Sequence, residues 1–219
     1  MALIRKAAWL VKRANDLSAG EAVLDERART IHDLATQRQI SQGDSEVMLG
    51  VGENLRGLIW TKRRESGQAR KALERATEML RATGLLRVGE DERNRYRAQA
   101  NVNLIQLEAM NGDINTAHRM AQKHMEWALS DDRGSGTEAI ILCGYMAFRA
   151  QSHPEALALA QQAETIVCRD GAVTQIAATR KLLLSIHHER GEIEMAQSVY
   201  DSLENDPVGL KAWVGGRDW

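Results

Sequence analysis

The stretch NVNLIQLEAMNGDINTAHRMAQKHMEWAL, residues 101–129, reads as two amphipathic helices on either side of a tight turn. Leu104 and Leu107 are spaced to share one helix face, and apolar residues after the turn recur every three or four positions. Glycine adopts left-handed backbone at little cost, so Gly112 predicts the end of the first helix. Asp113 predicts the N-cap of the second. The stretch therefore predicts an antiparallel helix pair.

A common spacing of apolar residues, glycines and alanines occurs in four places along the chain. An apolar residue precedes an alanine by thirteen positions, and a glycine usually precedes that alanine by five. The copies are Ile59/Gly67/Ala72, Leu104/Gly112/Ala117, Cys143/Gln151/Ala156 and Leu183/Gly191/Ala196, with steps of 45, 39 and 40 residues between the alanines. A repeat of this length predicts stacked helix pairs that share a continuous core, with small residues where two helices cross.

Extended along the chain, the pattern predicts an all-α fold of about five antiparallel helix pairs. The expected helices are 2–17 and 20–38, 45–65 and 67–82, 91–111 and 113–129, 136–151 and 153–168, and 172–190 and 192–205. Aromatic residues make up only 4% of the sequence and there are two prolines, which favours close packing of small side chains in helices over strands.

Composition excludes several classes of protein. Hydrophobic residues form 43% of the 219 residues, which is enough for a sizeable core. The formal net charge of -1 argues against a generally basic nucleic-acid binder. No apolar run reaches the about 20 residues of a membrane span, and the charged start lacks a signal-peptide apolar stretch. Cys143 and Cys168 lie among apolar neighbours and are predicted to be buried, reduced thiols of a cytoplasmic protein.

From about residue 99 to residue 203 the pattern resembles the tetratricopeptide repeat (TPR), a helix pair with small residues at the crossing. The matching positions are Leu104, Cys143, Gly144 and Leu183 in first helices and Ala117, Ala121, Ala156, Ala160, Ala196 and Tyr200 in second helices. The spacing exceeds the family's period of about 34 residues, and the usual aromatic of the first helix is replaced by Asn101, Ile140 and Arg180. The resemblance implies a right-handed superhelical stack, here one domain over 1–207 followed by a tail over 208–219.

In TPR proteins the first helices line a concave groove, and the resemblance implies a groove here as well. The positions that map to it are Asn54, Thr61, Arg64, Gln99, Gln106, Tyr145, Phe148, Arg149, Lys181, Ser185 and His188. This polar, mixed-charge set with one aromatic step suits a peptide or partner helix with acidic or amide groups, which Arg64, Arg149 and Lys181 would hold. The alternative is that these residues are ordinary solvated surface. The basic residues do not reproduce the family's clamp for a C-terminal carboxylate.

Catalytic chemistry is not indicated by the sequence. There is no GxxxxGK phosphate loop, and Gly50, Gly52 and Gly57 fall inside a helical pattern, which predicts close helix packing rather than a dinucleotide turn. Each of the six histidines is predicted to be structural or on the surface, because none has a partner at metal-ligand spacing. We therefore predict no enzyme, catalytic residue, cofactor or bound metal.

The favoured function is a cytoplasmic, bacterial-type adaptor or regulatory protein that binds a protein or peptide. The alternative is a transcription regulator, because residues 31–51 loosely resemble a DNA-binding helix–turn–helix and Lys62, Arg63 and Arg64 follow. Interspersed acidic residues make nucleic-acid binding the weaker interpretation.

The C-terminal tail is the least regular part of the sequence. Trp213 and Trp219 flank a Gly-Gly pair and are candidate anchors. We expect the tail either to cover the last helix pair or to dock on a second copy of the chain, which would give a homo-oligomer through the repeat ends or the tail.

Overall fold

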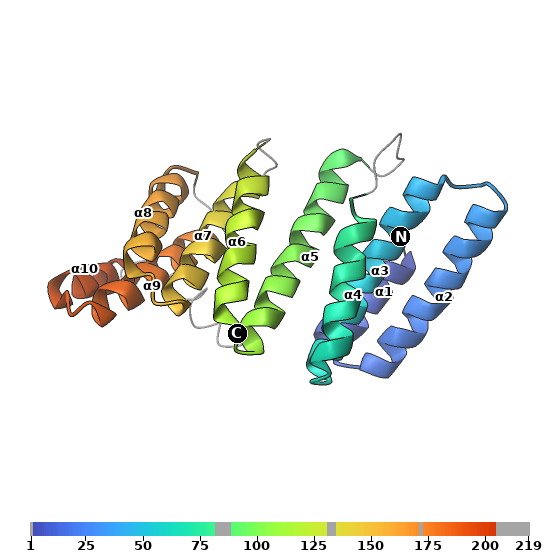
Figure 1. Ribbon diagram of the computed structural model, residues 1–219, viewed down its shortest axis with the longest axis horizontal. Coiled ribbons are helices and arrows are strands. Elements are labelled where there is room, and N and C mark those ends of the chain that lie inside the picture. The colour runs from blue at the N-terminus through green and yellow to red at the C-terminus, as the bar shows by residue number, and fades with distance from the viewer. Residues whose placement is uncertain (1, 82–88, 131–134, 171–172, 205–219) are drawn as a thin grey trace. The chain divides into compact units, whose positions relative to one another are not determined.

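The computed structural model describes residues 2–81, 89–130, 135–170 and 173–204, and within these ranges every regular element is a helix (Figure 1). This confirms the all-α class. The chain divides into two compact units, Met1–Gly112 and Asp113–Trp219. The right-handed sense of the stack, the number of pairs and the single-domain span 1–207 stay predictions. None of the described helices has the length and apolar character that crossing a membrane requires.

The first unit begins with a helix that departs from the expected span 2–17. The helices of this unit are α1 (Ala2–Trp9), the π-helical turn η1 (Leu10–Ala14), α2 (Leu17–Thr36), α3 (Gln42–Lys62), α4 (Ser66–Met79) and α5 (Glu90–Met110). The α-helix stops at Trp9 because the backbone widens into the π turn and then reverses at Asn15, whose φ is 53°. Helix α3 is the centre of the unit and packs against α1, α2, α4 and α5.

The second unit follows the expected spans to within a few residues. Its helices are α6 (Ile114–Leu129), α7 (Gly136–Arg149), α8 (His153–Asp170), α9 (Val173–Glu189) and α10 (Ile193–Glu204). Helix α7 packs against α6, α8 and α9, and α9 also packs against α8 and α10. The Asp113 carboxylate accepts a hydrogen bond of 3.1 Å from the Thr116 amide, which confirms the predicted N-cap of α6.

Left-handed residues end the first helix of each pair and set the repeat register. Gly112 and Gly191 have φ of 86° and 72°, as predicted, and in the copy without glycine Gln151 takes the same conformation at 61°. The prediction that Gly67 makes the corresponding turn in the first copy, Ile59/Gly67/Ala72, was wrong. Gly67 lies inside α4, and Arg64 makes the left-handed turn at 63°. The small residue five positions after that turn is therefore Ala69, which is fully buried, and not Ala72.

The glycines of α3 allow close helix packing, as predicted. A Cβ atom on Gly57 would lie 2.5 Å from both Cγ and Cδ2 of Leu73 in α4. One on Gly50 would lie 3.0 Å from the Leu80 Cγ atom. Leu73 and Leu80 are both fully buried, so neither side chain has open space to move into. Gly50 and Gly57 thus belong to the α3–α4 contact, whereas Gly52 faces Arg27 and Leu24 of α2, and the run is not a nucleotide-binding turn.

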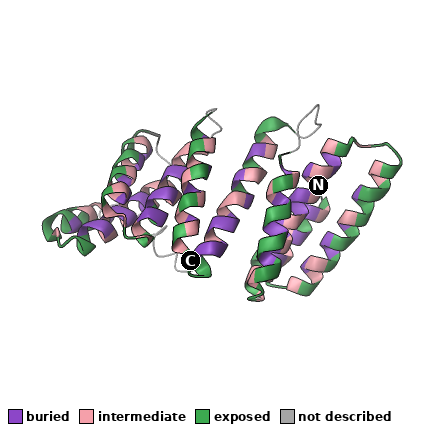
Figure 2. Cartoon of the chain, in the orientation of Figure 1, coloured by how far each residue is buried: buried purple, intermediate pink, exposed green. Residues whose placement is uncertain are grey.

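Alanines form the buried stripe of α8, where Ala156, Ala160 and Ala163 are all fully buried. Along the helices in general, buried residues alternate with exposed ones (Figure 2). The stripe continues at Val167, so the next residue along the helix is rotated away from it by about 100°. Cys168 is consequently exposed, and the prediction that both cysteines are buried holds for Cys143 only.

Candidate functional site

Side chains from α7 and α9 form an open surface depression of about 400 Å³ in the second unit. It is lined by Phe148, Leu184, Ser185, His188 and Glu189. Phe148, Ser185 and His188 belong to the predicted groove, so the fold brings together residues that the sequence separates by almost forty positions. The lining combines the apolar side chains of Phe148 and Leu184 with polar ones, which is a usual character of a binding site.

The Phe148 side chain is held by contacts on two sides. Its ring packs on the buried cluster that contains Ala147 and Leu182. The ring of His153, at the start of α8, meets it edge-on with centroids 5.9 Å apart. The His153 Nε2 atom also lies 3.8 Å from a Glu189 carboxylate oxygen. The Phe148 ring is therefore held in place by α8 as well as by α9.

Tyr145 and Arg149 stand one helical turn apart on α7 and contact each other. The Arg149 guanidinium donates a hydrogen bond of 3.4 Å to the Tyr145 hydroxyl and lies 5.9 Å from the ring centroid. Tyr145 is 40% exposed, which is high for so large an aromatic. On α9, the half-buried Ser185 hydroxyl donates to the Lys181 carbonyl oxygen. Lys181 is also half-buried.

Most of the predicted groove residues of the first unit make hydrogen bonds within that unit and do not line a depression with Phe148 and His188. Asn54 is only 6% exposed, and its side-chain oxygen accepts a hydrogen bond of 2.8 Å from Asn103 on α5. Gln99 is exposed and donates to the same Asn103. Thr61 donates to the carbonyl oxygen of Gly57, one turn earlier in its own helix. Asn54 and Thr61 thus serve mainly the internal structure of the unit.

The two remaining predicted groove residues of the first unit, Gln106 and Arg64, differ in how exposed they are. Gln106 on α5 is half-buried, whereas Arg64 is exposed on the left-handed turn after α3.

The basic run that suggested DNA contact, Lys62 to Arg64, is largely paired within the unit. Lys62 donates to the Val11 carbonyl and to the Asn15 side chain, both at 2.9 Å. Arg63 pairs with Glu21 at 2.9 Å and lies over the Trp60 ring. These contacts weigh against the DNA-binding alternative.

The predicted tail 208–219, with Trp213 and Trp219, lies outside the described residues.

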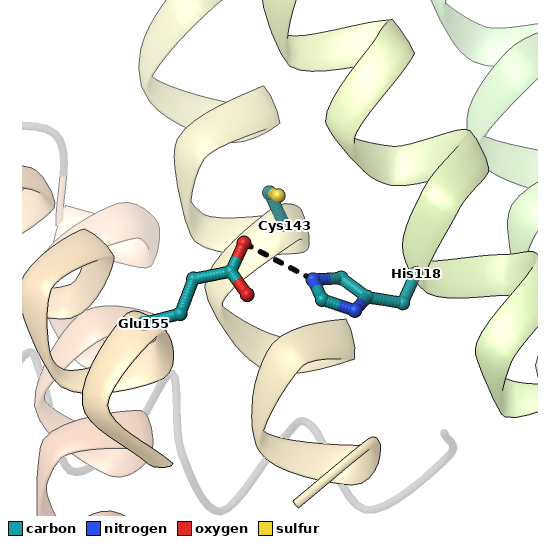
Figure 3. Close-up of side chains that lie close together, drawn as sticks. All are labelled: His118, Cys143 and Glu155. Carbon is teal, nitrogen blue, oxygen red and sulfur yellow. Dashed lines mark hydrogen bonds and ion pairs between the residues drawn. The ribbon is translucent and has the colours of Figure 1, made fainter. Parts of the chain in front are cut away.

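A second group of side chains, which the sequence did not reveal, meets where α6, α7 and α8 pack together. His118, Cys143 and Glu155 each offer one metal-binding atom, and the three atoms lie within 4.8 Å of one another (Figure 3). His118 Nε2 lies 3.2 Å from Glu155 Oε1. No short motif joins these residues. The repeat register gives a weak signal: it places Cys143 at a helix crossing, Glu155 beside Ala156 of the same repeat, and His118 beside Ala117 of the preceding repeat.

The surroundings keep Glu155 charged and Cys143 neutral. Burial opposes ionisation of Glu155, but hydrogen bonds from Gln122, His118 and Ser152 outweigh it and lower the pKa of this carboxyl. Burial is also the main cause that raises the pKa of the Cys143 thiol to about 12, and the nearby charges of Glu155 and Glu126 raise it further. The Cys143 thiolate is therefore scarce at neutral pH unless a cation stabilises it.

We expect a thiol-specific disulfide reagent to label one cysteine of the native chain rapidly and the second only after denaturation. Cys168 is exposed and reacts, whereas Cys143 is fully buried and, with a pKa of about 12, has roughly 10³-fold less thiolate than a free cysteine. The release of reporter thiol in native buffer and in denaturant measures this. The control Cys168→Ser should show no rapid phase, and two rapidly reacting thiols in the native wild type would contradict the burial of Cys143.

Comparisons with known proteins identify the fold. No protein-family model matches the chain, and no curated protein matches its sequence. Among solved structures, BtubC (BKLC) from P. vanneervenii is similar with a TM-score of 0.72 at 14% identity, over 99% of this chain and 80% of that chain.

Kinesin light chain-like structures from Podosopora anserina, with nearly identical TPR-like repeats, are also similar. One has a TM-score of 0.65 at 11% identity and covers 100% of this chain and 96% of its own. A point variant has a TM-score of 0.67 at 12% identity, with 97% and 95% covered. Identities this low establish the fold alone. The chain therefore has the fold of the TPR-like helical repeat proteins, as the resemblance implied.

Proposed function

We propose that this protein is a non-enzymatic scaffold or adaptor that binds a peptide or partner protein on the exposed side of α7 and α9. The depression lined by Phe148, Ser185 and His188 carries the proposal, because it joins three predicted groove residues beside the exposed pair Tyr145 and Arg149. TPR-like repeats are commonly used for protein–protein interaction, which supports the same conclusion.

The chemistry of this surface suggests what the partner presents to it. Phe148 and Leu184 offer apolar surface for one side chain of an extended peptide or helix. Arg149, already oriented by Tyr145, suits an acidic or amide group on the same partner. Glu189, which lines the same depression and lies near His153, would disfavour a second acidic group there. We place the protein in the bacterial cytoplasm in an adaptor or regulatory role, as the sequence predicted.

The last helix offers a place for self-association. On α10, Ile193, Met195 and Tyr200 are 62%, 54% and 41% exposed. Such apolar exposure at the end of a repeat array is normally covered. It supports the predictions that the C-terminal tail covers this helix or that the repeat ends join two copies.

Arg149→Glu combined with Tyr145→Ala should weaken partner binding by about 10–100-fold, since an exposed aromatic and its oriented cation are typical interface anchors. We would capture partners from a native lysate with the wild-type chain, identify them by mass spectrometry, and measure the affinity of each purified partner. Arg119→Glu on α6 is the matched control, because it reverses an exposed charge in the same unit and leaves α7 and α9 intact. Equal affinity of the double variant and the wild type would rule out this surface.

A further inference from the structure

The group formed by His118, Cys143 and Glu155 has the composition of a metal site. We propose that the His118 Nε2 atom, the Cys143 sulfur and a Glu155 carboxylate oxygen bind one divalent transition-metal ion of the zinc type, with water in the fourth position. The three residues come from three different helices, α6, α7 and α8, and α7 packs against both of the others (Figure 3). Three protein ligands with one open position is a common zinc arrangement.

The distances fit tetrahedral coordination after a small adjustment. A nitrogen and an oxygen ligand on the same zinc ion lie about 3.3 Å apart in tetrahedral geometry. The observed separation of His118 Nε2 and Glu155 Oε1 is 3.2 Å. A sulfur and a nitrogen ligand would lie about 3.6 Å apart. Since all three atoms lie within 4.8 Å of one another, the separation of the Cys143 sulfur from the other two ligand atoms needs to shrink by about 1.2 Å at most. Side-chain rotation can supply this without moving a helix.

The donor set and its charge also favour such an ion. Imidazole, thiolate and carboxylate are the three protein ligands of zinc, and one of each carries two negative charges in total. A dication neutralises that charge in a site where Cys143 is buried and the His118 side chain is 14% exposed. Glu126 contributes further negative potential at the sulfur. These carboxylates attract a cation to the site.

Neighbouring side chains already orient the carboxylate. Gln122 donates to Glu155 Oε1 at 2.9 Å, and Ser152 donates to Oε2 at 3.2 Å. Hydrogen bonds of this kind fix a ligand and commonly change metal affinity by about 10–100-fold. The Glu155 side chain is 33% exposed, so an ion has a route from solvent to the buried sulfur. Binding would tie α6, α7 and α8 together and make the stability of the second unit depend on the metal.

Cobalt(II) titration of the full chain tests the site, because a thiolate ligand gives cobalt an intense near-ultraviolet charge-transfer band. We expect the wild type to develop this band up to one ion per chain, to release about one thiol proton per ion, and to lose the band when zinc is added. Cys168→Ser, which removes the exposed cysteine, should behave like the wild type. Cys143→Ala should show neither band nor proton release.

Two further variants keep the test decisive if Cys143→Ala does not fold, which circular dichroism would reveal. His118→Gln and Glu155→Gln should each bind cobalt at least about tenfold more weakly, since each removes one of three ligands. No charge-transfer band in the wild type would overturn the proposal. So would a band that survives Cys143→Ala, one lost in Cys168→Ser, or unchanged affinity in both His118→Gln and Glu155→Gln. None of these outcomes depends on the partner-binding surface of α7 and α9.

Discussion

Gly57→Leu destabilises the first unit by about 1–3 kcal/mol, the typical cost of overpacking a core. Leucine has a higher helix propensity than glycine by almost 1 kcal/mol, so local preference alone predicts the opposite sign. Packing decides the result, because even a Cβ atom at this position would lie 2.5 Å from two atoms of Leu73. Leu73 is fully buried in α4 and can move only by displacing its neighbours.

Gly67→Leu is the matched control for this substitution. Gly67 lies near the start of α4, and a Cβ atom there would meet nothing within 4 Å. We expect this variant to be unchanged or stabilised by up to about 1 kcal/mol. Denaturant unfolding followed by far-ultraviolet circular dichroism would compare the midpoints of both variants with the wild type. Equal midpoints for Gly57→Leu and Gly67→Leu would show that α3 and α4 are not as closely packed as described.

Ala156→Leu is expected to destabilise the second unit by about 1–3 kcal/mol for a related reason. Ala156 is fully buried in the cluster that contains Ala160 and Ile186, and it lies at the crossing of α7 and α8. A larger side chain forces these helices apart, because small residues are what allow their close approach. It would also disturb the neighbouring Glu155, so we expect weaker cobalt binding in the same variant.

Ala158→Leu makes the same chemical change two residues further along α8, where the side chain is exposed. Its effect should stay within about 0.5 kcal/mol, as for most surface substitutions. The same denaturant experiment measures both variants, and circular dichroism before unfolding checks that helix content is unchanged. If Ala158→Leu costs as much as Ala156→Leu, then helix propensity or aggregation, and not the helix crossing, determines the effect.

Local features of the sequence were sufficient to predict the helices. The 3.6-residue periodicity marked most helix spans to within a few residues, and Gly112, Asp113 and Gly191 marked turns and a cap. These signals act within one or two helical turns, so they survive in any tertiary arrangement. The register of the first triple could not be predicted in this way, because Arg64 carries no sequence signal for a left-handed turn.

The candidate sites could be predicted less well than the helices, because they depend on how the helices pack. Among the predicted groove residues, Asn54 turned out to be buried and paired with Asn103, whereas Phe148 and His188 share one depression. A residue's helix position predicts its face, but the neighbouring helix decides whether that face is covered.

The sequence by itself determined that this chain is a helical repeat protein, because turn chemistry and hydrophobic periodicity are properties of short segments. Only the tertiary structure decided which side chains meet. His118, Cys143 and Glu155 are 25 and 12 residues apart and lie on three helices, so no spacing rule of a single helix relates them. Their convergence follows from the close packing of α7 against both α6 and α8, which buried alanines allow.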